Sequence, residues 1–232
     1  MEHVPAALGL AFGLANALAV VLFYRATRQS RRTLYVLLVW LLFQAGLGLS
    51  GFYAASPTTL PPRLLLALVP PLLLIMGLVL TRPGRAYLDG LRPDRLTLLH
   101  LVRVPVELVL LGLFLHQAVP QLMTFEGRNW DILSGLSAPL VYLLVFRRKQ
   151  LGPRFLLAWN VVCLGLLLNI VTNAVLSVPS PLQQFAFEQP NVAILHFPFV
   201  WLPSCVVPLV LLAHVAAIRL LVRELRAGRP QG

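Results

Sequence analysis

The chain has 232 residues, of which 58% are hydrophobic and only 12% are charged. Soluble globular domains carry about a quarter of their residues as charged side chains, so this composition excludes a soluble fold. The formal net charge of +11 would indicate a nucleic-acid partner for a soluble protein. In a membrane protein, however, basic residues set the orientation of the chain, and we therefore expect no nucleic-acid partner.

Seven apolar stretches follow one another along the chain, each bounded by charged or turn-forming residues. Most have the length of about 20 residues that a helix needs to cross a bilayer. The pattern predicts an all-α polytopic membrane protein, a bundle of seven transmembrane helices that forms one domain over residues 1–232. The expected spans cover residues 4–24, 34–54, 64–81, 96–118, 130–146, 155–176 and 192–218.

The last expected span holds three prolines at intervals of five residues, namely Pro198, Pro203 and Pro208. Proline removes a backbone donor and disturbs the preceding helical turn. We therefore expect this segment to enter as an interfacial stretch and to continue as a kinked helix.

Basic residues alternate between the connectors. Sixteen of the 19 lie in the connectors after the first, third and fifth spans and in the carboxyl-terminal tail, whereas the opposite connectors hold only Arg63 and Arg128. Because cytoplasmic loops carry the excess of Lys and Arg, the amino terminus is predicted to lie outside and the carboxyl terminus in the cytoplasm of a bacterial-type inner membrane. The same residues would attract anionic lipid headgroups.

The fourth expected span contains ionisable residues, which cost a few kcal/mol inside a bilayer. His100, Arg103 and Glu107 are three and four residues apart and share one helical face, so Arg103 and Glu107 are expected to pair within the helix. Asn169 and Asn173 of the sixth span are expected to line the same interior. Two interpretations remain: a neutralised ion pair that anchors the helix, or a proton-responsive or anion-binding centre that faces a cavity, with His100 as a possible proton partner.

The outer loops and helix ends hold a second group of chemically active residues. Imidazole and carboxylate groups suit zinc or iron, although no pair of histidines lies four residues apart. The alternative is that these loops are hydrogen-bonded to themselves. The residues of this candidate metal site are His116, Glu126, Asp131, Glu188 and His196.

Histidines at two depths also raise the question of haem. His100 and His214 are expected near the cytoplasmic face, and His116 and His196 near the outer face, so two bis-histidine layers are conceivable. His100 and His116 are 16 residues apart, about 160° out of phase on a helix. The periodicity therefore leaves room for one haem and disfavours two.

Seven helices with an external amino terminus resemble the rhodopsins, but the sole lysine, Lys149, lies in a cytoplasmic connector and excludes a retinal Schiff base. The topology also resembles the ceramidase and adiponectin-receptor hydrolases, whose late pair of histidines four apart is missing here. The segments 99–107, 125–131 and 191–203 resemble segments of uncharacterised bacterial seven-helix membrane proteins, a resemblance that implies no activity.

The chain shows no recognisable hydrolase, kinase or nucleotide-binding motif, which favours a non-enzymatic role. The leading prediction is an integral membrane protein that binds, senses or translocates a small solute or a proton. One alternative is a membrane-embedded protein that uses the outer-face histidines to hold zinc, iron or haem, as a metalloenzyme or for electron transfer. The other is a non-catalytic assembly partner, and homo-oligomerisation is left open.

Overall fold

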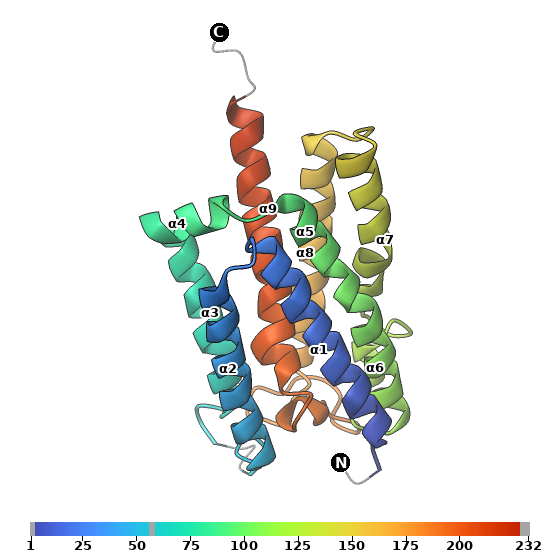
Figure 1. Cartoon of the computed structure of the whole chain (residues 1–232). Coiled ribbons are helices and arrows are strands. Elements are labelled where there is room, and N and C mark those ends of the chain that lie inside the picture. The colour runs from blue at the N-terminus through green and yellow to red at the C-terminus, as the bar shows by residue number, and fades with distance from the viewer. Residues whose placement is uncertain (1–2, 56–58, 228–232) are drawn as a thin grey trace.

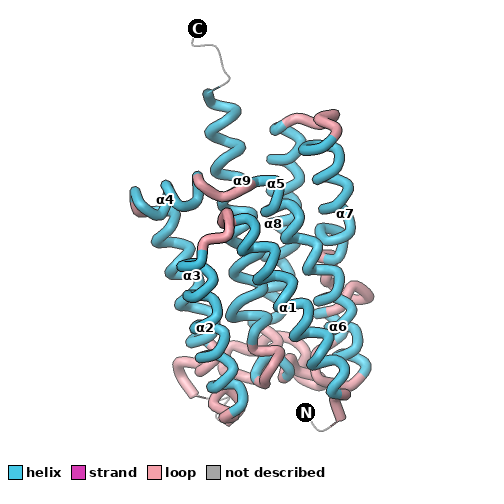
Figure 2. Tube along the Cα trace, in the orientation of Figure 1, coloured by secondary structure: helices cyan, strands magenta, loops and turns pink. Residues whose placement is uncertain are grey.

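A computed structural model describes residues 3–55 and 59–227, and this part of the chain is all-α, without a strand. Figures 1 and 2 show helices that run roughly side by side, with loops gathered at the two ends. The α-helices are α1 (Ala6–Ala26), α2 (Arg31–Leu49), α3 (Leu65–Leu80), α4 (Arg82–Asp89), α5 (Pro93–Leu99), α6 (Arg103–Leu115), α7 (Ile132–Tyr142), α8 (Pro153–Val175) and α9 (Val207–Ala227).

Short 3₁₀ or π turns extend or connect several of these helices. The 3₁₀ turn η1 (His100–Val102) joins α5 to α6, and the π turns η3 (Leu143–Arg147) and η5 (Leu202–Val206) extend α7 and α9. Two further 3₁₀ turns lie in loops, η2 (Gln121–Met123) and η4 (Ala193–Leu195).

Among the described residues, five continuous helical segments are long and apolar enough to cross a membrane: α1, α2, α5 to α6, α8, and η5 to α9. A sixth arises if the bent pair α3 and α4 is one span, and Ile132–Arg147 is a shorter apolar helix. The expectation of an all-α chain with several membrane-spanning helices is thus confirmed at this level.

The last expected span, 192–218, has the wrong bounds. The continuous helix covers Leu202–Ala227, while residues 192–201 form loop, η4 and turn. The physical cause lies in Pro198 and Pro203, which lack the backbone donors that would carry a helix through this stretch. The expectation of a separate entering segment followed by a helix with a local irregularity is met by η5, which contains Pro203.

The chain turns by 92° between α3 and α4. Thr81 caps α4, since its hydroxyl accepts a hydrogen bond from the backbone N–H of Gly84 at 3.2 Å, as N-cap threonines do. A Cβ at Gly84 would lie 2.4 Å from Cα of Leu78, so the bend requires glycine there. As a result α4 lies across the end of α3 (Figure 1).

Ion pairs hold α4 against the end of α9. Nε and Nη2 of Arg219 donate to the two carboxylate oxygens of Asp89 at 2.9 and 3.2 Å, and Arg223 also pairs with Asp89. The hydrogen bonds from Arg219, with the charge of Arg223 alongside, lower the pKa of the Asp89 carboxyl. The pair therefore fixes α4 at the end of the molecule where the carboxyl terminus lies (Figure 1).

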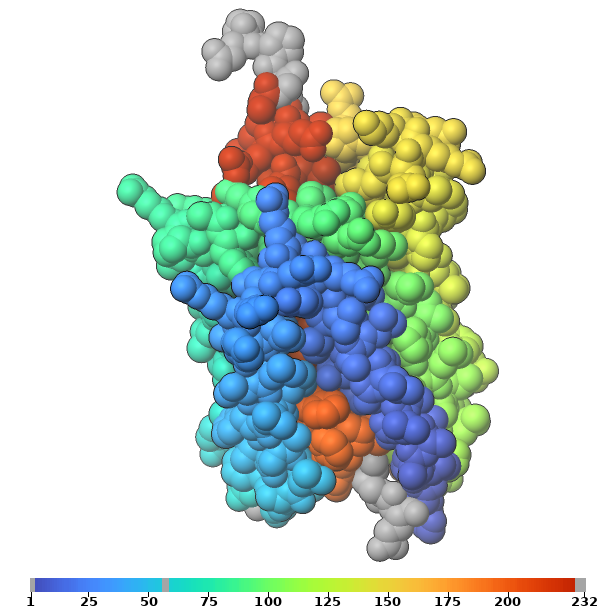
Figure 3. Space-filling view, viewed as in Figure 1, coloured from blue at the N-terminus to red at the C-terminus, as the bar shows by residue number. Residues whose placement is uncertain are grey.

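Burial distinguishes the centre of the bundle from its edge. In the most apolar window of the η5 to α9 segment, 61% of the residues are buried, compared with 17% for α2. The C-terminal helix is thus surrounded by the others, and α2 is peripheral. In Figure 3 the surface of α2 faces the viewer, and part of the chain around η5 is visible between α2 and α1.

Prolines and tryptophans tie α2 to the central helix. Pro208 has no N–H to donate to the carbonyl of Ser204 four residues earlier, and Nε1 of Trp40 donates to that carbonyl at 2.8 Å. Nε1 of Trp201 in turn donates to the carbonyl of Leu41 at 3.0 Å. Two indole groups therefore link α2 to the start of the central helical segment.

Candidate functional site

The helical segment α5 to α6 carries the expected ionisable face, and a 3₁₀ turn interrupts it next to these residues. Pro105 cannot donate to the carbonyl of Leu101, and the chain tightens into the 3₁₀ turn η1 immediately before α6. His100, Arg103 and Glu107 on this segment are 0%, 3% and 2% exposed. All three therefore lie inside the protein, as the sequence predicts.

The loop after α6 returns into the bundle. Thr124 Oγ1 donates to the carbonyl of Gln121 at 2.8 Å, and Gly127 packs so closely on the loop that a Cβ there would lie 2.3 Å from the Gln121 carbonyl oxygen. This tight turn reverses the chain. It delivers Asn129 and Asp131, which are 0% and 5% exposed, to the buried face of α6.

Asn129 connects this loop to Glu107 and Asp131 by hydrogen bonds. Its Nδ2 donates to Oε1 of Glu107 at 2.6 Å and to the carbonyl of Met123 at 2.9 Å. Its Oδ1 accepts from the backbone N–H of Asp131 at 3.1 Å, a local side-chain bond typical of asparagine in turns. Every polar atom of the Asn129 side chain is thus engaged, and the amide binds one carboxyl of the site while orienting the other.

Asp131 precedes α7, where aspartate usually caps the first turn. Its side chain makes no cap hydrogen bond; instead Oδ1 accepts from Nη1 of Arg103 at 2.7 Å. The predicted pair of Arg103 with Glu107 is wrong, because Glu107 is bonded to Asn129. Helical side chains lean toward the N-terminus, so Arg103 leans away from the turn that holds Glu107.

Gly135 lets α7 approach this point. A Cβ on Gly135 would lie 2.8 Å from Cγ2 of Val104 and 3.2 Å from Cβ of Arg103. Because glycine has no side chain, the backbone of α7 can rest directly on the α6 turn that carries the guanidinium. This contact holds Asp131, at the start of α7, within reach of Arg103.

His214 of α9 is a second hydrogen-bond partner of Arg103, with Nε2 2.8 Å from Nη2. Guanidinium can only donate, so Nε2 is the acceptor and the imidazole is neutral with its proton on Nδ1. That Nδ1–H donates to Oδ1 of Asn160 at 3.0 Å, and Nδ2 of Asn160 donates to the carbonyl of Leu156 at 2.9 Å. A chain of hydrogen bonds thus runs from Asp131 through Arg103 and His214 to α8.

His100 does not join this chain by a hydrogen bond. Its ring stacks on that of His214, with centroids 4.1 Å apart and planes at 20°, and meets the Trp159 ring edge-on at 5.4 Å. Neither ring nitrogen of His100 has a hydrogen-bond partner among the residues that the structure describes. Face-to-face stacking at this distance leaves no space for a porphyrin between the two imidazoles, so the geometry does not form the bis-histidine haem layer.

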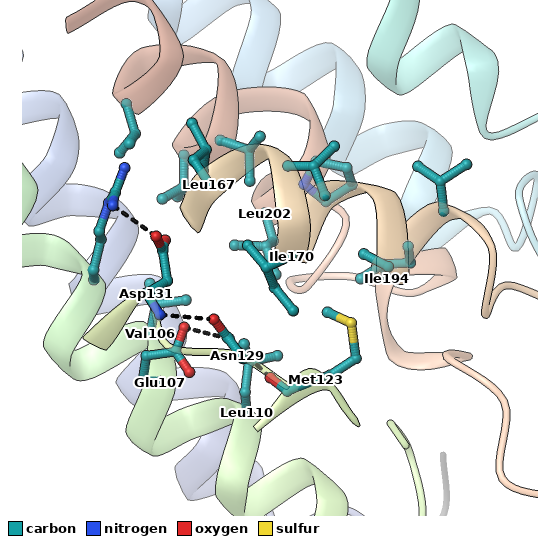
Figure 4. Close-up of a pocket in the computed structure, with 18 of the residues that line it drawn as sticks. Val106, Glu107, Leu110, Met123, Asn129, Asp131, Leu167, Ile170, Ile194 and Leu202 are labelled. Atoms are coloured by element: carbon teal, nitrogen blue, oxygen red, sulfur yellow. Dashed lines mark hydrogen bonds and ion pairs between the residues drawn. The ribbon is translucent and has the colours of Figure 1, made fainter. Parts of the chain in front are cut away.

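A cavity of about 70 Å³ lies against this network. Figure 4 shows the polar side chains Glu107, Asn129 and Asp131 along one wall, and apolar side chains such as Ile170 and Leu202 opposite. The guanidinium of Arg103 also lines it. The volume suits a few groups of the size of water. Because one wall is polar and charged and the other is apolar, a small occupant would contact charged groups on one side only.

Two lining side chains have buried polar atoms for which the described part of the chain offers no hydrogen-bond partner, Nε of Arg103 and Oε2 of Glu107. A buried polar atom left unpaired costs about 1–3 kcal/mol. Among the described residues that line the cavity, Arg103 supplies one positive charge, and Asp131 and Glu107 can supply two negative ones. The site therefore has a carboxylate more than its guanidinium can neutralise.

Asn169 and Asn173 lie beside the site and do not line the cavity, contrary to the expectation. Asn169 is exposed, and its Nδ2 donates to the carbonyl of Arg128 at 2.9 Å. Nδ2 of Asn173 donates to Oδ1 of Asn169 at 3.3 Å. Their helical face is turned toward the backbone of the returning loop, so they hold that loop in place from α8.

The expected metal residues are not assembled. Among the described residues no group of three or more His, Cys, Asp or Glu side chains is placed to hold a metal ion. Nδ1 of His116 bonds to the carbonyl of Gly112 at 2.8 Å, Asp131 is committed to Arg103, and Glu126 and Glu188 are exposed. His196, partly buried, lies outside the network around Arg103.

Fold and site together define a class: an all-α chain with several apolar helices long enough to cross a membrane and a buried, charged polar network between them. The chain belongs to the family described as a domain of unknown function, DUF8737, whose model matches residues 60–222. The expected membership of an uncharacterised family is thus confirmed, and the matched range contains the whole Arg103 network. No curated protein and no solved structure matches the chain.

Proposed function

We propose that the protein is a multi-pass protein of a bacterial-type cytoplasmic membrane, with seven spans, an external amino terminus and a cytoplasmic carboxyl terminus. Five segments are long and apolar enough to cross, and the proposal counts the bent α3 and the shorter Ile132–Arg147 helix as the other two crossings. The connectors that carry the basic clusters lie in the upper half of Figure 1, the half in which α9 ends. This distribution supports the orientation through the preference of Lys and Arg for the cytoplasmic side.

Within that topology, the protein binds, senses or translocates a small solute or a proton at the polar site around Arg103. The observation that carries this proposal is the unpartnered Oε2 of Glu107 on the wall of the cavity. Ionisable residues inside a membrane are expensive and usually mark a substrate, ion or proton pathway. A purely structural pair would need only Arg103 and Asp131.

Charge balance indicates what the site takes up. With both carboxyl groups ionised, the cavity wall carries one net negative charge, and an unpaired charge is strongly disfavoured in a medium of low dielectric constant. A proton on Glu107, or a small cationic group in the cavity, removes the excess. Binding and release of positive charge at Glu107 is therefore the elementary event of the proposed function.

The returning loop supplies a means of access. It starts at the outer end of α6, it is held from α8 by Asn169, and it carries Asn129, the partner of Glu107. A displacement of this loop would break the Asn129 contact and open the cavity toward the outer face at the same time. Occupancy at Glu107 would thus be coupled to the position of the loop.

The test is a comparison of Glu107→Gln with wild type and with a matched control, Glu126→Gln. The control removes an exposed carboxyl from the returning loop after α6. Infrared difference spectra during a pH titration should show a buried carboxyl signal in wild type and in the control that is missing in Glu107→Gln. In liposomes, proton uptake that follows a pH jump should be lost in the same variant. A folded Glu107→Gln protein with unchanged spectra and uptake would contradict the proposal.

A further inference from the structure

A second and larger groove lies on the opposite side of the central helix. It has a volume of about 390 Å³, within the range of about 300–1,000 Å³ typical of ligand pockets. Its walls come from α2 and α3, its floor from η5 and α9, and α4 closes one end. Lining residues include Val36, Leu37, Trp40, Leu74, Pro208 and Leu209.

The α2 wall is a helical face without a partner helix. Thr33, Val36, Leu37 and Trp40 follow the spacing of three and four residues that places them on one face, and all four line the groove. Of the 19 residues of α2, only Leu41, Gln44 and Gly48 are buried. The groove therefore separates α2 from α3 along an apolar surface.

One end of the groove is polar and positive. Arg32 lines it, and no described carboxylate pairs with Arg32. The N-terminus of α2 lies at the same place, with no acidic residue in its first turn, so the helix dipole adds positive potential. Thr33 and Tyr87 close this end through a hydrogen bond of 3.2 Å between their hydroxyl groups.

The position of the polar end matches the headgroup level of a leaflet. It lies at the end of the molecule where the basic connectors gather (Figure 1), whereas the apolar length of the groove continues along α2 toward Trp40. No acidic residue is found among the described residues that line it. An occupant with an anionic head and a hydrocarbon chain fits this polarity, and a second copy of this basic chain does not.

We propose that this groove binds one anionic phospholipid from the leaflet at the basic end of the molecule, with an acyl chain between α2 and α3 and the phosphate group at Arg32. Bidentate recognition of phosphate oxygens is a property of guanidinium. The site rests on the proposed membrane topology but is independent of the Glu107 network, so a failure of one site leaves the other intact.

The test uses protein reconstituted in phosphatidylcholine nanodiscs that contain a minor fraction of phosphatidylglycerol with brominated acyl chains. Trp40 lines the groove, so its fluorescence reports bromine there; the contribution of Trp40 is obtained by difference from Trp40→Phe. Quenching should exceed that produced by the same fraction of brominated phosphatidylcholine. Native mass spectrometry should show one phosphatidylglycerol retained by each wild-type chain.

Three variants define the outcome. Arg32→Gln should lose the excess quenching and the retained lipid, Arg32→Lys should keep part of both, and Arg31→Gln should keep both in full because Arg31 is the adjacent arginine of α2 and does not line the groove. Circular dichroism checks that each variant is folded. Equal quenching by both lipids, no effect of Arg32→Gln, or retention of a second protein chain in place of lipid would each overturn the proposal.

Discussion

The ion pair between Arg103 and Asp131 allows the sharpest test of the site. The two charges are 2.7 Å apart, and their side chains are only 3% and 6% exposed. Arg103 also binds His214, so Asp131→Asn leaves a guanidinium that is held in place, desolvated and without its nearest counter-ion. Breaking a buried pair by removing one partner costs roughly 3–5 kcal/mol.

Two reference substitutions set the scale. Asp94→Asn removes the acidic partner of Arg92, a pair of similar length at 2.9 Å whose arginine side chain is 45% exposed, so a cost of about 0–1 kcal/mol is expected. Glu107→Gln retains the Oε1 acceptor for Asn129 and should cost about 1 kcal/mol, the net value of one altered hydrogen bond.

The assay is equilibrium unfolding in mixed detergent micelles, followed by circular dichroism, for Asp131→Asn, Arg103→Gln and the double variant. The double variant should recover roughly 0.5–3 kcal/mol relative to the sum of the single changes, which is the coupling energy expected of residues in contact. If Asp131→Asn costs no more than Asp94→Asn, or if the coupling is zero, then the buried pair does not organise this site. If Glu107→Gln lowered the free energy of unfolding as much as Asp131→Asn, the result would instead support the predicted ion pair of Glu107 with Arg103.

Two further predictions concern the supporting structure. Asp89→Asn should lower the free energy of unfolding by about 0.2–1 kcal/mol at neutral pH. Folding lowers the pKa of Asp89 below its usual 3.8. The stabilisation from the Asp89 ion pairs is therefore present above pH 3.8 and is lost as the pH falls through the lowered pKa. Wild type and variant should therefore converge in acid, which pH-dependent unfolding curves would show, and a constant difference at every pH would exclude the ion pair as its source. Gly127→Ala should destabilise the protein by roughly 1–3 kcal/mol through overpacking and disturb the Asn129 contact. Gly165 has open space around it, so Gly165→Ala should be neutral or stabilising by up to about 1 kcal/mol. Equal melting temperatures for the two variants would refute the role of the close contact between Gly127 and Gln121.

Apolar periodicity and charge placement carry most of the information about the helices. A stretch of about 20 apolar residues has few alternatives to a helix in a bilayer, because every backbone group must find a partner within the segment. The sequence therefore predicts α1, α2 and α8 to within a few residues. The expected span 192–218 begins ten residues before the continuous helix, because the stretch that contains Pro198 is as apolar as the helix; the prolines predict a separate entering stretch but do not define the residue at which the helix begins.

The buried face of α6 could also be predicted, since His100, Arg103 and Glu107 share one helical face and are too costly to expose to lipid. The residues that form hydrogen bonds and ion pairs with this face could not be predicted. Asn129 lies in the polar loop before the expected span 130–146 and Asp131 lies at the outer end of that span, where side chains normally stay at the surface. Only Gly127, which permits the tight reversal against Gln121, distinguishes this loop from a surface connector, and one glycine in a loop is too common a feature to signal re-entry.

The two carboxyl groups of the site differ in what holds them, and this difference assigns their roles. Asp131 meets a full positive charge at 2.7 Å, and its backbone N–H is fixed by Asn129, so its ionised form is compensated within the protein. Glu107 meets only the neutral amide of Asn129 on one oxygen, and its other oxygen is unpaired at the cavity. Protonation of Asp131 would leave the guanidinium of Arg103 without its counter-ion, whereas protonation of Glu107 removes the excess negative charge and breaks no ion pair. In the proposed function, exchange of a proton or cation is therefore assigned to Glu107, and the pair of Arg103 with Asp131 is assigned the structural role.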